Sequence, residues 1–448
     1  MNFTQAQTNG WEKVDDGIVG PIVSFYSNFE EDSTLYVGGQ FEYCVPNGPW
    51  PLEICQRSIT AIKDNEFILI PSGTPFWGNV HRITNYKNDI YIGLSSGGQR
   101  SLFHLDKINS TWIDLSDSLF DYQGQIGGGV RGLELYNGEL LIGGSFLKLN
   151  QDTVFGTVLW DGVKFKPFWN YTPESGMIQF ILNDIAVYKG EVYAAGSFIV
   201  SPYGNGLSLI KFNGEKWVPV GVPYMLGNTA SYALEVYNNE LYVGGFIKKA
   251  DGYAGNYIMR WNGTSWNELG TSVNAPVLDM IVYNNDLYVC GIFTHAGGEN
   301  AMYIARWDGS QWHKIDDSVF DWNFNINTMV VHDEYLYIAC GPTINGDTFN
   351  RIARRYVGPK NTDDIEDIIN IYPNPMAEQL TLEYDLDKVS DFKFALYDVV
   401  GNIVYEEQNS NVYGYYYYSI PTVNLAAGLY IARVELNGKT ISKKIIKN

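Results

Sequence analysis

The sequence predicts an all-β protein, in which a seven-bladed β-propeller is followed by a small immunoglobulin-like β-sandwich. Three observations lead to this prediction. A strand-like block recurs seven times, the period of that block ends near residue 358, and the composition favours strands and tight turns. Among 448 residues there are 33 Tyr, 22 Phe, 12 Trp and 46 Gly. Aromatic residues are enriched in strands, and glycine is enriched in turns.

The recurring block is an apolar strand that ends in small residues. Its spacing of about 50 residues suits a four-stranded propeller blade and is too long for leucine-rich or ankyrin repeats. In the sixth copy, we expect strands at 277–283, 287–293 and 303–307 and a last strand at Trp312, after an Asp308-Gly309 hairpin turn. The seven copies begin at Leu35, Ile90, Leu140, Val192, Leu241, Leu287 and Leu336.

An aromatic residue follows the final turn of six units. Because a repeated position serves the repeated architecture, we expect these rings to pack between neighbouring blades rather than to bind a ligand. The six residues are Phe67, Trp112, Phe165, Trp217, Trp266 and Trp312.

The seventh unit is incomplete, since it stops at Gly358 without a final aromatic strand. The missing piece is similar to residues 9–14 at the other end of the chain. We therefore expect the N-terminal strand to complete the last blade and close the ring, which leaves no unpaired strand edge. The predicted domains are a propeller over 1–358, a linker over 359–368 and a sandwich over 369–448.

The blades resemble the kelch type of propeller repeat over residues 9–358. The resemblance lies in the strand that ends in a Gly pair and in the spaced aromatic pair such as Trp307 and Trp312. Unit two departs from the pattern with Gly93-Leu94, and units four, six and seven break the Gly pair. The resemblance implies a fold and leaves the activity open.

Short alternating strands follow the acidic linker, and four ordered motifs lie among them. The expected strands are 369–372, 379–385, 391–397, 402–407, 413–419, 429–436 and 440–446. The motifs are Ile371-Tyr372-Pro373-Asn374-Pro375, Leu396-Tyr397-Asp398-Val399-Val400-Gly401, Leu425-Ala426-Ala427-Gly428-Leu429-Tyr430 and Lys443-Lys444-Ile445-Ile446-Lys447.

These motifs resemble the type A C-terminal sorting domain of the bacterial type IX (Por) secretion system. The resemblance implies that the secretion machinery binds residues 369–448 and that the protein is released or held at the outer cell surface. The sorting-motif residues are then Tyr372, Pro373, Asn374, Pro375, Gly401, Gly428, Lys443 and Lys444.

The first residues of the chain, MNFTQAQTNGW, have neither a basic head nor an apolar stretch. Since the family crosses the inner membrane with a signal peptide, we expect that peptide to be absent from this sequence. The alternative is an ordinary sandwich domain in a cytosolic protein.

Charge and cysteine usage restrict the partners. Acids outnumber bases 50 to 30, and a net charge of −20 disfavours nucleic acid, while no apolar stretch predicts a transmembrane segment. Cys44 and Cys55 lie in one loop and predict a disulfide in an oxidising compartment, with two free thiols as the alternative. Cys290 and Cys340 are expected to be separate buried residues. No CxxC pair is present, so a zinc-thiolate site is not expected. No cofactor or metal site is predicted, and calcium binding is left open.

No catalytic motif is recognisable in the sequence. There is no GxSxG elbow, P-loop, dinucleotide fingerprint or HExxH. The five histidines fall in five separate contexts, and His295 is expected to be a solvated loop residue. They are His81, His104, His295, His313 and His332.

The favoured function is that of a secreted or cell-surface binding protein, with a glycan or protein ligand on the loops of the ring. The alternative is an extracellular carbohydrate-active enzyme, whose carboxylates would come from different blades and so escape recognition in a sequence. An intracellular kelch-like scaffold is disfavoured by the C-terminal motifs. Clustered carboxylates with perturbed pKa values at the ring axis would favour the enzyme, and a flat aromatic face would favour binding.

Overall fold

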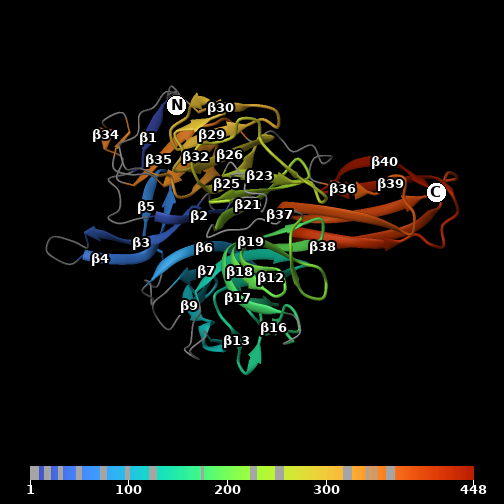
Figure 1. Ribbon diagram of the computed structural model, residues 1–448, viewed down its shortest axis with the longest axis horizontal. Helices are drawn as coiled ribbons and strands as arrows, with labels where there is room; N and C mark the ends of the chain where they lie inside the picture. The colour runs from blue at the N-terminus through green and yellow to red at the C-terminus, as the bar shows by residue number, and fades with distance from the viewer. Residues whose placement is uncertain are drawn as a thin grey trace. The chain divides into compact units, whose positions relative to one another are not determined.

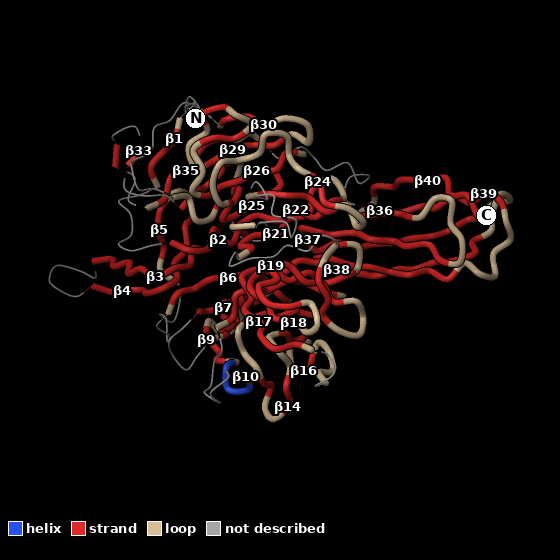
Figure 2. Tube along the Cα trace, in the orientation of Figure 1, coloured by secondary structure: helices blue, strands red, loops and turns tan. Residues whose placement is uncertain are grey.

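The computed structural model confirms the predicted all-β fold. The chain divides into two compact units, built mainly from residues 1–359 and mainly from residues 360–448. In the part that the structure describes, the 3₁₀ turn η1 (Ser116–Ser118) is the one helical element (Figure 2). The described residues are 10–14, 22–28, 34–46, 53–70, 78–95, 101–120, 129–172, 176–221, 230–247, 257–315, 325–339, 343–344, 347–348, 351–359 and 369–448.

Seven four-stranded antiparallel sheets make up the blades of the first unit within the described residues (Figure 1). In hydrogen-bonding order the first three are β2 (Ile22–Asn28), β3 (Thr34–Pro46), β4 (Glu53–Lys63) and β5 (Glu66–Ile68); β6 (Asn79–Tyr86), β7 (Asp89–Ser95), β8 (Leu102–Asp106) and β9 (Thr111–Asp114); and β11 (Val130–Tyr136), β12 (Glu139–Gly144), β15 (Thr157–Trp160) and β16 (Phe165–Pro167).

The fourth to sixth sheets follow the same order. They are β17 (Met177–Tyr188), β18 (Glu191–Val200), β19 (Gly204–Phe212) and β20 (Trp217–Pro219); β21 (Ser231–Tyr237), β22 (Glu240–Gly245), β23 (Ile258–Trp261) and β24 (Trp266–Asn267); and β25 (Val277–Tyr283), β26 (Asp286–Gly291), β29 (Ile304–Trp307) and β30 (Trp312–Lys314).

The seventh sheet joins the two ends of the repeat region. It contains β31 (Met329–His332), β32 (Tyr335–Ala339), β35 (Ile352–Tyr356) and the N-terminal strand β1 (Trp11–Lys13), which pairs with β35. An ion pair of 3.0 Å between Arg354 and Glu12 accompanies this pairing. The outer strand of the last blade is thus supplied by the start of the chain.

Smaller strands decorate the blades. They are β10 (Leu119–Phe120) with β13 (Lys148–Leu149) and β14 (Asp152–Thr153), β27 (His295–Ala296) with β28 (Glu299–Asn300), and β33 (Thr343–Ile344) with β34 (Asp347–Thr348).

The first strand of each sheet contacts the first strand of the next, so these seven inner strands line the ring. Direct contacts connect β2 with β6, β17 with β21, β21 with β25, β25 with β31, and β31 with β2. Hydrogen bonds connect β6 with β11 and β11 with β17. The ring is therefore continuous through all seven blades.

The repeated aromatic residues pack where one blade meets the next. The Trp312 indole N–H donates to the carbonyl of Leu269 in the preceding blade at 2.9 Å. A side chain at Gly221 would place its Cβ 2.6 Å from Nε1 of Trp266, and Gly221 has a φ of +71°. Glycine is required there because the Trp266 ring takes the space.

A tyrosine at the end of the inner strand links several blades in a second way. The hydroxyls of Tyr188 and Tyr237 donate to carbonyls in the first turn of the next blade, at Asn239 (2.9 Å) and Asn285 (2.8 Å). Asn285 and its neighbour Asn284 have φ values of +63° and +52°. Asparagine tolerates this conformation, which suits a tight hairpin turn.

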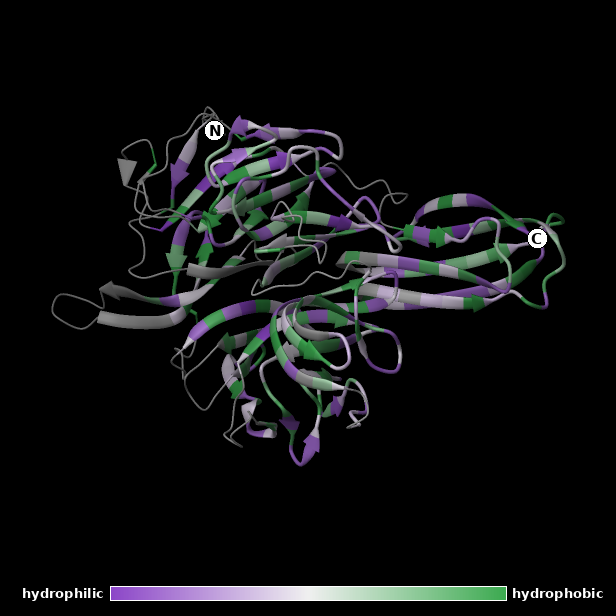
Figure 3. Ribbon diagram, viewed as in Figure 1, coloured by the Kyte–Doolittle hydropathy of each residue, from purple (hydrophilic) through white to green (hydrophobic). Residues whose placement is uncertain are grey.

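The second unit is a five-stranded arrangement of long strands. Its order is β36 (Ile369–Tyr372), β37 (Gln379–Tyr397), β39 (Gly428–Leu436) and β40 (Lys439–Lys447), and β38 (Ile403–Pro421) pairs with β37. Hydrophobic and hydrophilic residues alternate along many of these strands (Figure 3), which is the pattern of sheets with one buried face.

Two pairs of predicted strands are single strands here. β37 runs through 379–385 and 391–397, and β38 runs through 402–407 and 413–419 apart from Asn402. Their pairing register shifts between Leu386 and Ser390, and no Gly or Pro interrupts β37 there. Each strand still contributes both halves to one core, in which the rings of Tyr384 and Phe392 stack with centroids 4.2 Å apart.

Candidate functional site

Five of the seven inner strands have a β-bulge at the same position of the repeat. A bulge adds one residue to a strand and redirects its side chain, and bulges are frequent next to functional sites. The pairing with the second strand shifts between Ile22 and Ser24, Val80 and Arg82, Leu182 and Asp184, Ser231 and Ala233, and Val277 and Asp279. The extra residues are Val23, His81, Asn183, Tyr232 and Leu278, and the same place in the sequence repeat is held by Arg131 and Asn327.

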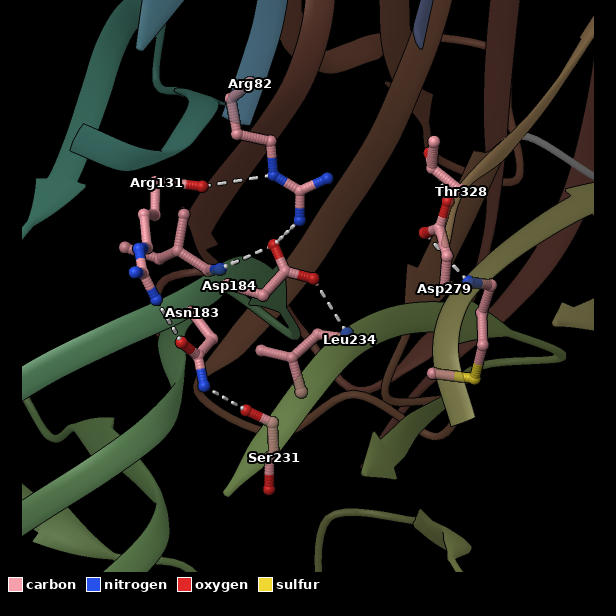
Figure 4. Close-up of polar contacts among 10 residues, drawn as sticks. Arg82, Arg131, Asn183, Asp184, Ser231, Leu234, Asp279 and Thr328 are labelled. Atoms are coloured by element: carbon pink, nitrogen blue, oxygen red, sulfur yellow. Dashed lines mark hydrogen bonds and ion pairs between the residues drawn. The ribbon is translucent and has the colours of Figure 1, made fainter. Parts of the chain in front are cut away.

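Asp184 follows the bulge of β17 and connects three blades (Figure 4). Its side chain is buried, with a residue exposure of 6%. One carboxylate oxygen accepts a hydrogen bond from the Leu234 N–H of β21 at 2.8 Å. The other oxygen forms an ion pair with the guanidinium of Arg82 from β6. Asp184 thus clamps the fifth blade to the fourth and neutralises an arginine of the second.

A chain of polar contacts continues from Arg82 around the ring (Figure 4). Arg82 Nε donates to the carbonyl of Arg131 at 3.2 Å, and Arg131 Nη1 donates to Asn183 Oδ1 at 2.8 Å. Asn183 Nδ2 donates in turn to the carbonyl of Ser231 at 2.9 Å. The polar residues of blades two to five are therefore held in one network.

Asp279 occupies in β25 the place that Asp184 occupies in β17. Its Oδ2 accepts hydrogen bonds from the Thr328 hydroxyl at 2.8 Å and from the Met329 N–H at 3.0 Å. Burial raises its pKa above the usual value, although Arg82 and these hydrogen bonds oppose that shift. The negative charge of Asp184 raises the pKa further. Asp279 is thus a second inter-blade clamp, and one whose charged form is disfavoured by burial.

Two further groups at this level differ in charge. Burial lowers the pKa of His81 to about 4, and the charges of Arg131 and Arg82 lower it as well, so the His81 imidazole is neutral at pH 7. Burial also lowers the pKa of the Arg131 guanidinium. For Arg82, burial acts in the same direction, but the charges of Asp184 and Asp279 outweigh it and raise the pKa.

Aromatic rings adjoin this network in the fifth blade. Tyr232 is the bulge residue next to Ser231, and its ring meets that of Phe246 edge-on with centroids 6.2 Å apart. The ring of Phe246 meets that of Tyr257 at 6.3 Å. Phe246 is 43% exposed. Such a group offers apolar ring surface beside fixed polar groups, as ligand sites commonly do.

The described residues contain no group of three or more His, Cys, Asp or Glu that could hold a metal ion. Across the same parts of the chain, none of the helices is long and apolar enough to cross a membrane.

The predicted sorting-motif residues at 372–375 and 443–447 lie together. Asn374 donates through Nδ2 to the Lys444 carbonyl at 2.8 Å and accepts at Oδ1 from the Ile446 N–H at 3.0 Å. Met376 continues the contact, since its N–H donates to the Ile446 carbonyl at 2.7 Å. The segment that contains Pro373 and Pro375 therefore covers the outer edge of β40, an edge that would otherwise be open to another strand.

The remaining motif residues have separate structural places. Gly401 lies in a tight turn with a φ of +93°. In this turn the Asp398 side-chain oxygen Oδ1 accepts hydrogen bonds from the N–H groups of Val400 (3.0 Å) and Asn402 (2.9 Å). Gly428 begins β39, shortly before Tyr430, whose hydroxyl donates to the carbonyl of Ala426 at 2.8 Å.

The two lysines of the motif differ in their contacts. Lys443 Nζ donates to the carbonyl of Ile369 at 3.2 Å. In the motif at 371–375, the Tyr372 hydroxyl donates to a Glu383 carboxylate oxygen at 2.9 Å. Lys444 is exposed. The part that each of these residues plays in sorting remains a prediction.

The cysteines have partly described surroundings. Cys44 and Cys55 are direct partners in the antiparallel register of β3 and β4, but their side chains lie outside the described residues, so the disulfide remains a prediction. Cys290 is buried with a free thiol whose pKa burial raises. Cys340 lies outside the described residues.

Among the histidines, His295 is exposed, with Nδ1 3.0 Å from the Thr294 hydroxyl. His313 pairs with Asp308 at 2.7 Å within one hairpin. His81 is the histidine that the fold brings into the polar network, and sequence reasoning missed it together with Arg82, Arg131, Asp184 and Asp279. An alignment of the seven inner strands would have found them, because polar residues interrupt those strands at the bulge and at the following position.

Comparison with known families decides the nature of the C-terminal unit. Residues 370–448 match the family model described as "Secretion system C-terminal sorting domain". The match confirms the predicted sorting domain. It indicates secretion through the type IX system, to the cell surface or the extracellular space, and thus an interaction with that machinery.

Comparisons of the whole chain add little. No curated protein matches it. Two solved structures are similar at 12% identity: a glycoside hydrolase family 43 arabinoxylan arabinofuranohydrolase from Bacillus subtilis in complex with cellotetraose, and a protein titled "Glycoside hydrolase". The first match covers 81% of this chain and 93% of the other with a TM-score of 0.26. The second covers 82% and 99% with a TM-score of 0.29. Likenesses this weak carry no argument about activity.

Proposed function

We propose that this is a binding protein of the cell surface or the extracellular space, with a kelch-like propeller that holds a glycan or protein ligand near the ring axis. The observation that carries the proposal is the hydrogen-bonded contact of Arg131 with Asn183 and of Asn183 with Ser231, which places Tyr232 beside them, from three successive blades. Arg131, Asn183 and Tyr232 stand at one position of the repeat and differ in chemistry, whereas the preceding position is apolar in six of the seven inner strands. Chemical variation at a convergent position of a repeated scaffold is what a ligand site requires.

The role of the aspartates also favours binding over catalysis. Both Asp184 and Asp279 accept hydrogen bonds from backbone N–H groups of the next blade. Their carboxylates are thereby committed to holding blades together, which leaves fewer lone pairs for a substrate.

A glycan array with the intact protein tests this proposal. We expect retention of one class of saccharide, and loss of that binding in a Tyr232→Ala variant but not in the exposed control Val163→Ala. Absence of binding to any saccharide, together with absence of a captured protein ligand from the cell surface, would contradict it.

A carbohydrate-active enzyme is the second candidate, and the raised pKa of Asp279 is the observation that favours it. Because burial raises the pKa of Asp279 above its usual value, this carboxyl group holds its proton to a higher pH than a free aspartate, as a general acid in glycoside cleavage must. Release of reducing ends from a bound polysaccharide, abolished in Asp279→Asn, would establish this activity. Turnover that persists in the variant would exclude Asp279 as the acid.

The C-terminal unit is proposed to act as an export signal through its terminal strand. Deletion of 363–448 should leave the protein in the periplasm. Asn374→Ala removes two hydrogen bonds to the edge of β40, so it should reduce the secreted fraction. Asn213→Ala, which removes two hydrogen bonds in a propeller turn, is the control. Secretion of the deleted chain at the normal level would contradict the assignment.

We also propose the Cys44–Cys55 disulfide. Residues directly opposed in an antiparallel pair have Cα atoms about 4.5–5.5 Å apart, which lies within the range that a disulfide spans. Alkylation of the secreted protein before and after reduction should reveal two additional thiols only after reduction. Labelling of both thiols before reduction would disprove the bond.

A further inference from the structure

Arg131 differs from the other arginine of the network in its partners. Arg82 forms an ion pair with Asp184 and also lies within the field of Asp279. Arg131 donates to the neutral amide oxygen of Asn183 at 2.8 Å. Within the described residues no carboxylate pairs with Arg131, and burial alone accounts for its lowered pKa. The positive charge of Arg131 is therefore oriented but not neutralised.

A desolvated cation without a counter-charge costs free energy. The network nevertheless fixes Arg131 in place, since its carbonyl accepts from Arg82 and its guanidinium is oriented by Asn183. Asn183 is in turn anchored on Ser231. A fixed guanidinium with unused N–H donors is suited to a planar anion such as a carboxylate.

His81 supplies a neutral hydrogen-bonding group beside this charge. It is half-buried and lies close enough to Arg131 and Arg82 for both charges to lower its pKa. A neutral imidazole offers one N–H donor and one acceptor. The combination of one guanidinium and one imidazole matches a single carboxylate with a neighbouring hydroxyl.

The aromatic group begins at the residue that follows the anchor of Asn183. Ser231 receives the Asn183 amide, Tyr232 follows it, and the rings of Phe246 and Tyr257 continue from Tyr232. Aromatic faces carry partial negative charge, so they attract the C–H groups of a sugar ring. An acidic peptide would use the cation equally well, but it would gain less from a row of rings beside it.

We propose that the ring axis binds an acidic saccharide, with the carboxylate of a uronic acid residue on Arg131 and His81 and an adjoining sugar ring on Tyr232 and Phe246. This inference rests on the proposed binding function and names its ligand class. Asn183 is the positioning residue that orients Arg131.

The test uses the intact protein, an α-1,4-linked tetragalacturonate and the methyl ester of the same tetrasaccharide, with affinities from titration calorimetry. The acid should bind about 10- to 100-fold more tightly than the ester, as expected for a charge-assisted hydrogen-bonded pair. Arg131→Gln should weaken the binding of the acid by a similar factor and leave the affinity for the ester unchanged. Arg433→Gln, at an exposed arginine of the C-terminal unit, is the matched control and should leave both affinities unchanged.

The acid and its ester form a comparison that needs no variant, so a folding defect in Arg131→Gln does not remove the test. Equal affinity for acid and ester would overturn the inference, as would preferential binding of a sulfated oligosaccharide or of an oligoglutamate peptide. Binding of neutral saccharides alone would overturn the inference but leave the proposed function in place. Binding of no saccharide at all would overturn the inference, and it would contradict the proposed function as well if no protein ligand were captured.

Discussion

Asp184 and Asp279 occupy the same place in blades four and six, yet their surroundings differ. Both follow a bulge, and both accept a hydrogen bond from the backbone of the next inner strand. Asp184 has Arg82 as a direct ion-pair partner, whereas Asp279 accepts from the Thr328 hydroxyl and from the backbone N–H groups of Met280 and Met329. The repeat thus fixes the position of a carboxylate, and residues from other blades decide its side-chain partners.

The residue after the bulge also differs between blades two, three and four. Gly132 stands in the blade between Arg82 and Asp184, at the position after the bulge. A side chain there would place its Cβ 2.6 Å from Ile185, so the third blade needs glycine at this place. The residue at the position after the bulge therefore decides which blades are joined by side-chain contacts, such as the ion pair of Arg82 with Asp184.

The largest expected effect is on stability. Asp184→Asn removes the partner of Arg82 and leaves a desolvated cation, which should cost about 3 kcal/mol of unfolding free energy. Asp279→Asn keeps an acceptor for Thr328 and Met329 and removes a charge that burial disfavours, so it should cost about 1 kcal/mol or less. Chemical denaturation of both variants checks this. Equal costs would mean that Arg82 contributes nothing to the difference between the clamps.

The next effect is on the pH dependence of stability. His81 has a pKa of about 4 in the folded protein against an ordinary 6.5, so between these values the unfolded chain binds more protons. Stability should then fall as the pH is lowered from 6.5 to 4, by about 2 kcal/mol for this half-buried ring. Asp279 acts in the opposite direction, because its raised pKa favours the folded state as the pH falls toward its ordinary value.

His81→Asn should therefore flatten the loss of stability between pH 6.5 and 4, and Asp279→Asn should steepen it. Unfolding free energies measured at four or five pH values for the three proteins are sufficient. If the pH dependence of the unfolding free energy is unchanged in His81→Asn, burial in the propeller does not lower the pKa of this histidine.

The smallest effect concerns the junction between blades five and six, where Ala233 stands in place of an aspartate. Alanine offers no carboxylate to the next blade at this position, and the Tyr237 hydroxyl donates to the Asn285 carbonyl. Tyr237→Phe should cost about 1 kcal/mol. The matched variant Tyr188→Phe, at a junction that Asp184 also clamps, should cost less. The reverse order would argue that the aspartate clamps and the tyrosine contacts are independent.

The sequence predicted the blades well because their signals are local. Each apolar strand ending in small residues, such as Leu241–Gly245, and each turn, such as Asp308-Gly309, lies within one repeat. The sandwich strands were less well predicted. β37 passes from its first half to its second without Gly or Pro, and a shift in its pairing register with β38 between Leu386 and Ser390 marks the place instead.

The candidate site was not predictable from local signals. His81 looks like one of five unrelated histidines, and Arg131 looks like a lone charge in an apolar strand. Arg82 and Asp184 are 102 residues apart, and only the closed ring makes them partners. The residues that carry chemistry are those that depart from the repeat, and their meaning depends on the neighbouring blades.

The pairing of β1 with β35 has a consequence for the order of folding. Glu12 and Arg354 are 342 residues apart in the chain, so they meet only after nearly all of the propeller has been synthesised. Contacts so distant in sequence form slowly, because the intervening chain must first lose its freedom. The blades can assemble one after another along the chain, but the ring closes last, and until then β35 presents an open edge.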